Sequence, residues 1–228
     1  MNTSKLSQYP ASARSEYGFS LIEVVLAIGI FLVTVLALVG MLGPTLQSVD
    51  EVEKTDEIAS VVNTVNAFLQ SSPDIAVSGQ SKFETIYKEL NTDGFITAFV
   101  FRAYDNNDDI NLVVGFGDKF DVGEVDKARV SAANIITNSN VIAAGPVYRI
   151  FLTASSVTPV DHLTNGSRDA NGVFYLSKNF LEYPEGYLAM EVRIFSEDPK
   201  SAVRDYGKLL RDVANIEPLF TYNTAIVR

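Results

Sequence analysis

The 228-residue chain has no cysteine, no tryptophan and a single histidine. Without cysteine there is no disulfide, no thiolate zinc site and no thiol nucleophile. One histidine also leaves little for metal binding or for general acid–base catalysis. We therefore predict no cofactor, no metal site and no enzymatic activity. The ten tyrosines and fourteen phenylalanines supply bulky material for a hydrophobic core.

Positive charge is scarce as well. Lys and Arg number 18 against 28 Asp and Glu, a net charge of −10. Residues 1–18 carry Lys5 and Arg14 against Glu16, a net +1, which leaves −11 for the rest of the chain. Phosphate binding requires clusters of Lys and Arg, and the sequence has no basic stripe. Nucleic acid is therefore not an expected partner.

One long run has no formal charge: Val24–Val49, 26 residues, preceded by Glu23. A membrane-spanning helix needs about 20 apolar residues, so residues 19–43 are predicted to form the transmembrane half of an N-terminal helix. A carboxylate in hydrocarbon is costly and by default indicates a functional site. The alternative is that Glu23 lies at the headgroup level and only marks the edge of the helix.

The run is longer than the hydrophobic region of a cleavable secretory signal, and no small-residue cleavage site follows it. The positive leader favours a cytoplasmic N-terminus, with the C-terminal domain outside. An ordinary uncleaved anchor would have the same orientation.

The residues before this carboxylate form a specific pattern. A polar leader, residues 1–18, ends in Gly18 and is followed by Phe19, with Glu23 as the fifth residue after the leader. Gly18-Phe19-Ser20-Leu21-Ile22-Glu23 resembles the class III signal of type IV pilins and type II secretion pseudopilins. The resemblance implies cleavage between Gly18 and Phe19 by a prepilin peptidase, followed by N-methylation of Phe19.

The resemblance also implies a function. The chain would be a pilin-like subunit, a minor pilin or pseudopilin, of a type IV pilus or type II secretion-like filament. Its partners would be the prepilin peptidase, other pilin or pseudopilin subunits, the inner-membrane assembly platform and the lipid bilayer. It would cross the inner (cytoplasmic) membrane once, with its C-terminal domain periplasmic or extracellular. The carboxylate of Glu23 would pair with the new N-terminal ammonium of a neighbouring subunit.

Two features refine this expectation. The absence of cysteine and a mature length of 210 residues suit a minor pilin or pseudopilin better than a compact major pilin. The segment Val39–Ser48 also resembles the helix exit of pilin-like Verru_Chthon cassette proteins. The alternative function is a membrane-anchored extracytoplasmic binding domain that is not assembled into a filament, and a membrane-tethered enzyme comes third.

Residues 44–72 are predicted to continue the helix as an amphipathic half, with an apolar stripe from Leu46 to Leu69. Gly40, Gly43 and Pro44 form a weak point, because proline lacks an N–H and its ring clashes with the carbonyl four residues earlier. This point is either a harmless kink or, as in pilins, a place where the helix melts during assembly. Pilins often carry a proline at mature position 22, which is Gly40 here.

Residues 73–228 are predicted to form a globular α+β domain. The whole fold would be pilin-like, with the long N-terminal helix covering the one buried face of an antiparallel sheet. In Tyr187–Phe195, every second residue from Leu188 to Ile194 is apolar, with Glu191 and Arg193 on the other face. Asp198 is expected to cap a helix that begins at Pro199. The predicted strands and first helix are Lys82–Leu90 (helix), Phe95–Tyr104, Ile110–Phe116, Val147–Thr153, Tyr187–Phe195 and Phe220–Val227. The apolar face of the later helix would comprise Val203, Tyr206, Leu209, Leu210 and Val213.

Two acidic loops are candidate calcium sites. Residues 105–109 resemble a calcium loop, but an EF-hand needs Gly at the sixth position and Glu at the twelfth, where the sequence has Ile110 and Phe116. A solvated hairpin turn is the preferred interpretation. The second loop leaves calcium binding and a solvated loop open, and its acidic residues are Asp118, Asp121, Glu124 and Asp126.

We interpret the remaining candidate residues as structural and not functional. His162 lies near Ser155 and Ser156, but no spacing suggests a catalytic triad, and we interpret it as a loop residue. Phe95, Phe99 and Phe101 are interpreted as core residues of a strand. We find no catalytic constellation in the sequence.

Overall fold

The computed structural model describes residues 18–71, 75, 80–104, 109–117, 128–137, 140–207, 212 and 216–228. The chain divides into two compact units, residues 1–54 and 55–228. Helix α1, Leu21–Ser71, begins in the first unit and ends in the second. It agrees with the predicted helix to within two residues at either end.

The first unit contains one segment that is long and apolar enough to cross a membrane, Leu21–Gly43. At 1.5 Å per residue its 23 residues extend about 35 Å, more than the hydrocarbon thickness of a bilayer. Inside this segment the hydroxyl of Thr34 donates to the carbonyl of Ile30 at 2.8 Å, so this polar group is satisfied within the helix. The backbone stays helical through residues 40–44.

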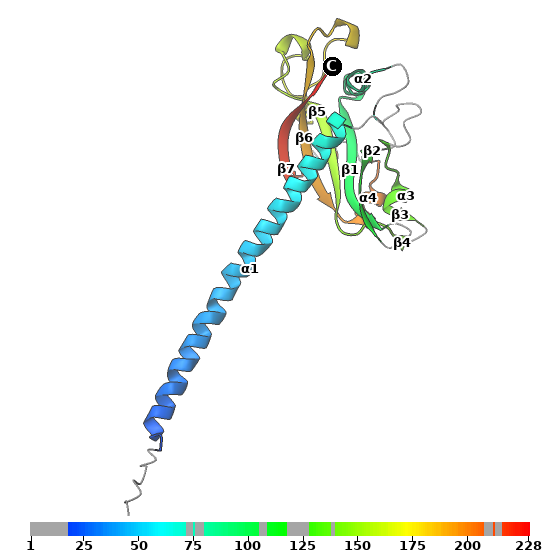
Figure 1. Ribbon diagram of the computed structural model, residues 1–228. Coiled ribbons are helices and arrows are strands. Elements are labelled where there is room, and N and C mark those ends of the chain that lie inside the picture. Colours follow the sequence, from blue (N-terminus) through cyan, green and yellow to red (C-terminus); the bar gives the residue numbers. More distant parts are fainter. Residues whose placement is uncertain are drawn as a thin grey trace, which may run out of the picture. The chain divides into compact units, whose positions relative to one another are not determined.

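The second unit is built on an antiparallel five-stranded sheet in the order β2-β1-β5-β6-β7 (Figure 1). The register joins Phe99 of β1 to Gly115 of β2 and to Arg149 of β5. The chain is thus α+β with a long N-terminal helix, and the predicted hairpin between the first two strands is confirmed. The strands are β1 Phe95–Tyr104, β2 Ile110–Phe116, β5 Val147–Ala154, β6 Tyr187–Glu197 and β7 Phe220–Val227. The smaller elements are α2 Lys82–Asp93, α3 Ala132–Ile135, β3 Ile136–Thr137, β4 Asn140–Val141, η3 Val160–His162, η4 Phe180–Glu182 and α4 Pro199–Arg204.

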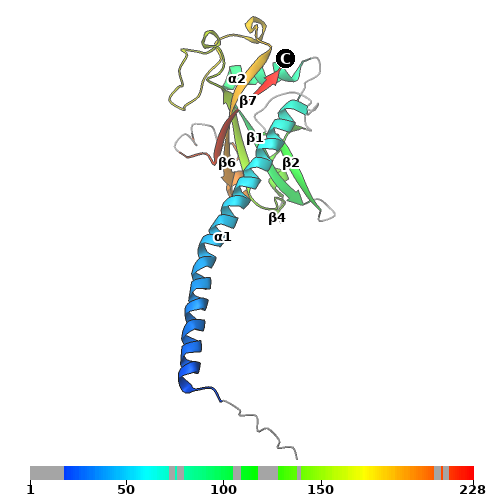
Figure 2. The ribbon, with the colours of Figure 1, turned by 60° about the vertical axis from the view of Figure 1, so that its left-hand side comes forward.

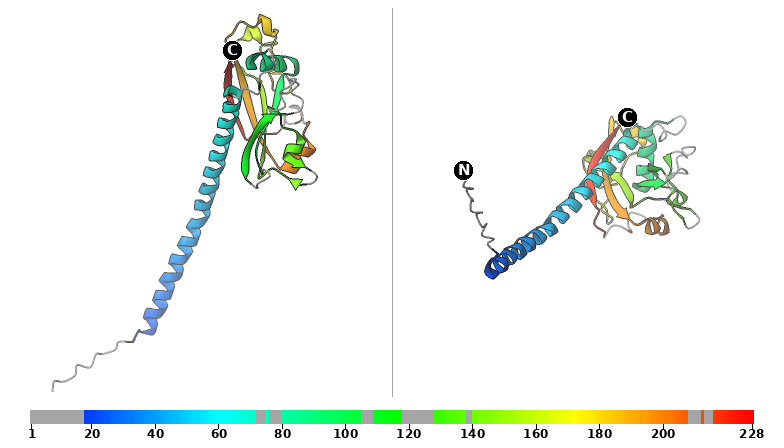
Figure 3. Two further views of the ribbon diagram at one scale, coloured as in Figure 1. Left: turned by 45° about the vertical axis from the view of Figure 1, so that its right-hand side comes forward. Right: turned by 60° about the horizontal axis from the view of Figure 1, so that its bottom comes forward.

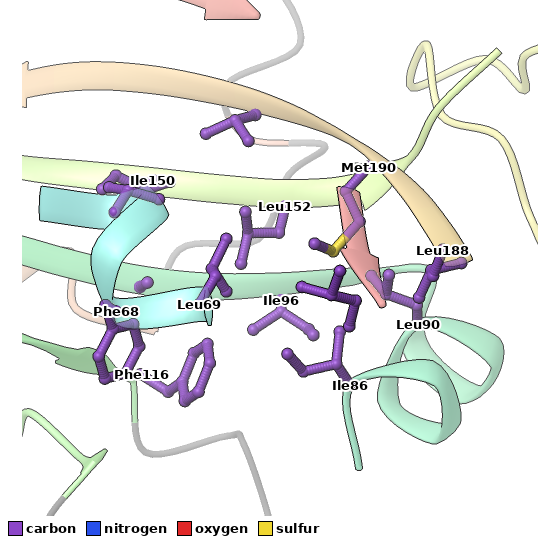
Figure 4. Close-up of a cluster of buried hydrophobic side chains, with 14 of the residues drawn as sticks. Phe68, Leu69, Ile86, Leu90, Ile96, Phe116, Ile150, Leu152, Leu188 and Met190 are labelled. Atoms are coloured by element: carbon purple, nitrogen blue, oxygen red, sulfur yellow. The ribbon is translucent and has the colours of Figure 1, made fainter. Parts of the chain in front are cut away.

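One face of the sheet, which we call the first face, is covered by the last turns of α1 and by α2 (Figures 2 and 4). Thr224 and Tyr222 of β7 also donate hydroxyl hydrogen bonds to the amide oxygen of Asn66 in α1, at 2.9 and 3.4 Å. The apolar side chains buried here include Val61, Val65, Phe68, Leu69, Ile86, Leu90, Ile96, Ile150, Leu152, Leu188, Met190, Val192 and Ile194.

In the second unit, the last part of the predicted apolar stripe of α1 covers the sheet. Val49 and Val52 are 57% and 61% exposed, whereas Val61 and Val65 are buried. Within the second unit, the apolar cover supplied by α1 begins with the half-buried Ile58. Helical periodicity shows which residues share a face of a helix but not where along the helix a partner begins.

The opposite, second face of the sheet is also buried, which corrects the prediction of a single buried face. Phe99 and Phe101 pack with Val130 and Ile135 near α3 and with Ala202 of α4. Figure 3 (left) shows these small elements on the side of the sheet away from α1. Further along the face, a second cluster contains Phe95, Phe151, Val173, Tyr175 and Phe195. The interpretation of the three phenylalanines of β1 as core residues is confirmed for Phe99 and Phe101, and Phe95 is half-buried.

A fully buried arginine joins this second face to the segment after β6. Arg149 of β5 is bonded to both carboxylate oxygens of Glu197, at 3.0 and 2.9 Å. It also donates to the carbonyls of Ala202, Asp205 and Tyr206, and its guanidinium lies 4.8 Å from the ring centroid of Phe99. This arrangement fixes α4 and the turn that follows it against the sheet.

The start of α4 is as predicted. The side chain of Asp198 accepts from the backbone N–H of Lys200 at 2.9 Å, and Pro199 is the first helical residue. The helix ends at Arg204, however, and not near Val213. Of its expected apolar residues, Leu209, Leu210 and Val213 lie outside the described residues.

Candidate processing and assembly site

The Gly18–Phe19 bond lies in non-helical backbone directly before α1. The side chain of Phe19 is 87% exposed, and no other part of the described chain lies within 4 Å of the Cβ position at Gly18. A peptidase must bind its substrate in an extended form, with the backbone of the cleaved bond open to its active site. The described residues around this bond are exposed and not helical, so the bond is open to a peptidase.

Glu23 stands in the first turn of α1 and closes a reciprocal cap with Ser20. The backbone N–H of Ser20 donates to the Glu23 carboxylate at 2.9 Å. The backbone N–H of Glu23 donates to the hydroxyl of Ser20 at 3.3 Å. This is a capping box, in which two N–H groups that the first helical turn leaves free are bonded by side chains. The negative charge also lies at the positive end of the helix dipole.

Sequence reasoning missed Ser20 as a functional residue. The signal was present, because Ser-x-x-Glu directly before an apolar run is the signature of a capping box. Ser20 also belongs to the class III signal motif, in which Glu23 is a charge in need of a partner. The structure gives that charge a partner within its own chain.

The arrangement places one carboxylate within hydrogen-bonding distance of the backbone nitrogen of Ser20, the residue after Phe19. If the chain were cut before Phe19, the new ammonium group of Phe19 would lie one residue from the Ser20 N–H that Glu23 already binds. Such a site can hold one positive charge, either from its own chain or from an adjacent one.

The second group of predicted residues lies elsewhere on α1. Gly40 and Gly43 are helical, and no side chain or distant backbone of the described residues lies within 4 Å of their Cβ positions. Gly40 follows Glu23 by 17 residues, or about 26 Å along the helix. The structure does not bring the two groups together. Melting of the helix near Pro44 stays a prediction.

The acidic loops are mostly outside the described residues. Asp105 to Asp108 and the second acidic group, from Asp118 to Asp126, belong to those parts, and Asp109 is described. Among the described residues, no cluster of three or more His, Asp or Glu side chains could hold a metal ion. Calcium binding by either loop therefore stays an untested alternative.

His162 is more buried than a loop histidine is expected to be. It lies in the 3₁₀ turn η3 with 5% of its surface exposed, and its ring packs edge-on to Tyr183 at 4.9 Å. Its Nε2 is 3.6 Å from a carboxylate oxygen of Glu185. The nearby hydroxyl of Ser155 donates instead to the amide oxygen of Asn223 at 2.7 Å. These contacts are those of a packed core residue.

A small pocket in the second unit combines polar and apolar walls. It is lined by Glu57, Val61, Arg102, Leu112 and Tyr148, among others. Burial, together with a hydrogen bond to Glu57, raises the pKa of Tyr148 above its usual value, so its hydroxyl stays protonated. Two hydroxyl side chains, Ser60 and Thr64, also line it, and that of Thr64 donates to the backbone carbonyl of Ser60 at 2.8 Å.

No protein-family model matches the chain, and searches of curated proteins and of solved structures found no match.

Proposed function

We propose that the chain is a pilin-like subunit, a minor pilin or pseudopilin, of a type IV pilus or type II secretion-like filament. One observation carries the proposal. The exposed Gly18–Phe19 bond directly precedes a capped helix whose third residue is Glu23 and whose first 23 residues could cross a membrane. The class III signal places a cleavage site, a carboxylate and a membrane span in this order.

Processing would hydrolyse the bond between Gly18 and Phe19, leaving a carboxylate on the leader and an ammonium on Phe19. Methylation of that nitrogen retains its positive charge. In a bundle of parallel helices the ammonium of one subunit can bind the Glu23 carboxylate of the next. Because an unpaired charge in hydrocarbon costs at least roughly 2.5 kcal/mol, this pairing would favour docking and fix the subunit register.

The capping box gives Glu23 a partner before assembly. In the free subunit the carboxylate accepts from the N–H of Ser20. Docking would therefore replace or share a hydrogen bond that already exists, so the gain is smaller than the full cost of an isolated charge. The α+β unit would stand outside the inner membrane, periplasmic or extracellular, with a structural and not a catalytic role.

The test is whether the chain enters filaments. Cells expressing the chain with its prepilin peptidase and assembly platform would be sheared, and the filament fraction probed for it. We expect the wild-type chain in that fraction and expect Glu23→Val to be processed but absent from it. A wild-type chain confined to the membrane fraction would favour the anchored binding domain instead.

A further inference from the structure

Strand β7 forms one border of the sheet and pairs on one side only, with β6 (Figures 1 and 2). Its pairing phase follows from one bond, in which the N–H of Arg228 donates to the carbonyl of Gly186 at 2.9 Å. In an antiparallel ladder hydrogen-bonded pairs alternate, so residues 220, 222, 224 and 226 bond to β6. The N–H and C=O groups of Thr221, Asn223, Ala225 and Val227 then point away from the sheet. In the described part of the chain, no backbone or side-chain group binds them.

Natural proteins usually protect such an edge with Lys, Pro, a bulge or a covering segment. Phe220–Val227, FTYNTAIV, has no charged residue, no proline and no glycine over its eight residues. The other border strand, β2, is covered at its C-terminal end. Phe116 of β2 forms a parallel bridge with Arg129, and its carbonyl accepts from the N–H of Val130. Among the residues that the structure describes, the β7 edge is thus long, uncharged and open, which is the geometry that accepts an added strand.

We propose that β7 binds an extended, uncharged segment of a partner protein, which adds to the sheet as a sixth strand. The backbone groups of residues 221, 223, 225 and 227 would supply the hydrogen bonds. On the first face the added strand would meet Phe220, Tyr222 and Thr224, which favour aromatic or β-branched side chains opposite them. On the second face it would meet Thr221 and Ala225, which favour small or polar ones.

Charge argues for a different protein over a second copy of this chain. Residues 55–228 contain 15 Lys and Arg against 23 Asp and Glu, a net charge of −8. Two such units side by side would repel each other, most strongly at low ionic strength. A neutral strand meets no such repulsion and matches the neutral edge.

The experiment uses the full chain in lipid nanodiscs and a fluorescein-labelled eight-residue peptide of alternating Val and Thr. Binding is read as fluorescence anisotropy. Ala225→Pro removes one outward N–H while leaving every β6 bond in place, and proline is tolerated on an edge strand at such a position. Ala225→Val is the matched control, because it retains the N–H and the strand propensity.

We expect the peptide to bind the wild type and Ala225→Val alike, and to bind Ala225→Pro about tenfold more weakly. A peptide N-methylated on the hydrogen-bonding edge should not bind the wild type, and this measurement does not depend on how a variant folds. Absence of peptide binding, equal binding to all variants, or equal binding of the methylated peptide would overturn the proposal. Dimerisation of the chain through β7, abolished by Ala225→Pro, would assign the edge to a second copy and overturn it too.

Discussion

Ser20 and Glu23 allow the cap of α1 to be separated from the charge that assembly would require. Glu23→Gln preserves the cap, because glutamine at this position accepts from the N-cap N–H as glutamate does. It removes the negative charge. Ser20→Ala does the reverse, since it deletes the hydroxyl that accepts from the N–H of Glu23 at 3.3 Å and retains the carboxylate.

The two variants should therefore reduce filament assembly by different amounts. Losing an N-cap hydroxyl costs about 1 kcal/mol, a factor of roughly five in an equilibrium constant. Glu23→Gln would instead leave the uncapped Phe19 ammonium of the neighbouring subunit without its carboxylate partner, and an unpaired charge in hydrocarbon costs at least roughly 2.5 kcal/mol, a factor of about 70. Subunit docking is repeated along a filament, so the larger effect should abolish assembly and the smaller one only reduce it.

The assay is the fraction of each variant recovered in sheared filaments, with processing checked by gel shift and helix content by circular dichroism. We expect Glu23→Gln to be processed and helical but absent from filaments, and Ser20→Ala to remain in them in reduced amount. If Glu23→Gln assembled normally while Ser20→Ala did not, the carboxylate would serve only as a cap and the ion pair would be refuted.

Two further predictions concern the second unit. Arg149→Ala should lower the free energy of unfolding by about 3–5 kcal/mol, because it leaves Glu197 and several carbonyls without their buried partner. Chemical denaturation measures this free energy. A loss below about 1 kcal/mol would contradict the prediction. Burial raises the pKa of Tyr87, Tyr183 and Tyr222 to about 12, above about 10 in the unfolded chain. Their contribution to stability is complete below pH 10 and is lost as the pH rises toward 12. A phenolate absorbance titration of the folded protein should show these three groups ionising near pH 12 instead of near pH 10.

The strands of the five-stranded sheet were predictable because each has a local sequence signal, whereas the two-residue strands β3 and β4 were not predicted. Phe95–Tyr104 and Ile110–Phe116 are rich in aromatic and β-branched residues and are separated by a short polar loop, and the observed bounds are the predicted ones. Phe220–Val227 is also rich in aromatic and β-branched residues, and its observed bounds are again the predicted ones. The start of α4 was also predictable from the local sequence, because aspartate is a typical N-cap residue and proline is typical of the first helical position.

The second buried face was not predictable from local pattern. In β5, Arg149 alternates with apolar residues and would be placed in solvent by periodicity alone. Its partners, Glu197 and the carbonyls near Tyr206, lie about fifty residues later in the chain, and only the strand order β1-β5-β6 brings them together. The length of the cover supplied by α1 depends on the same tertiary arrangement.

At the candidate site, the signal motif could be recognised from the local sequence, but the capping box within it was not predicted. Gly18, Phe19 and Glu23 were chosen because they match a processing signal. The role of Ser20 is not part of that signal and follows from ordinary helix capping. The two roles are compatible, since a capped carboxylate at the start of a helix that is long and apolar enough to cross a membrane could also bind a neighbouring ammonium.

The mass of the N-terminal peptide of the chain, isolated from a host that expresses its own prepilin peptidase, tests the central claim most directly. The account predicts a chain that begins with an N-methylated Phe19 and lacks residues 1–18. A chain that begins at Met1 or at any position other than Phe19 would contradict it.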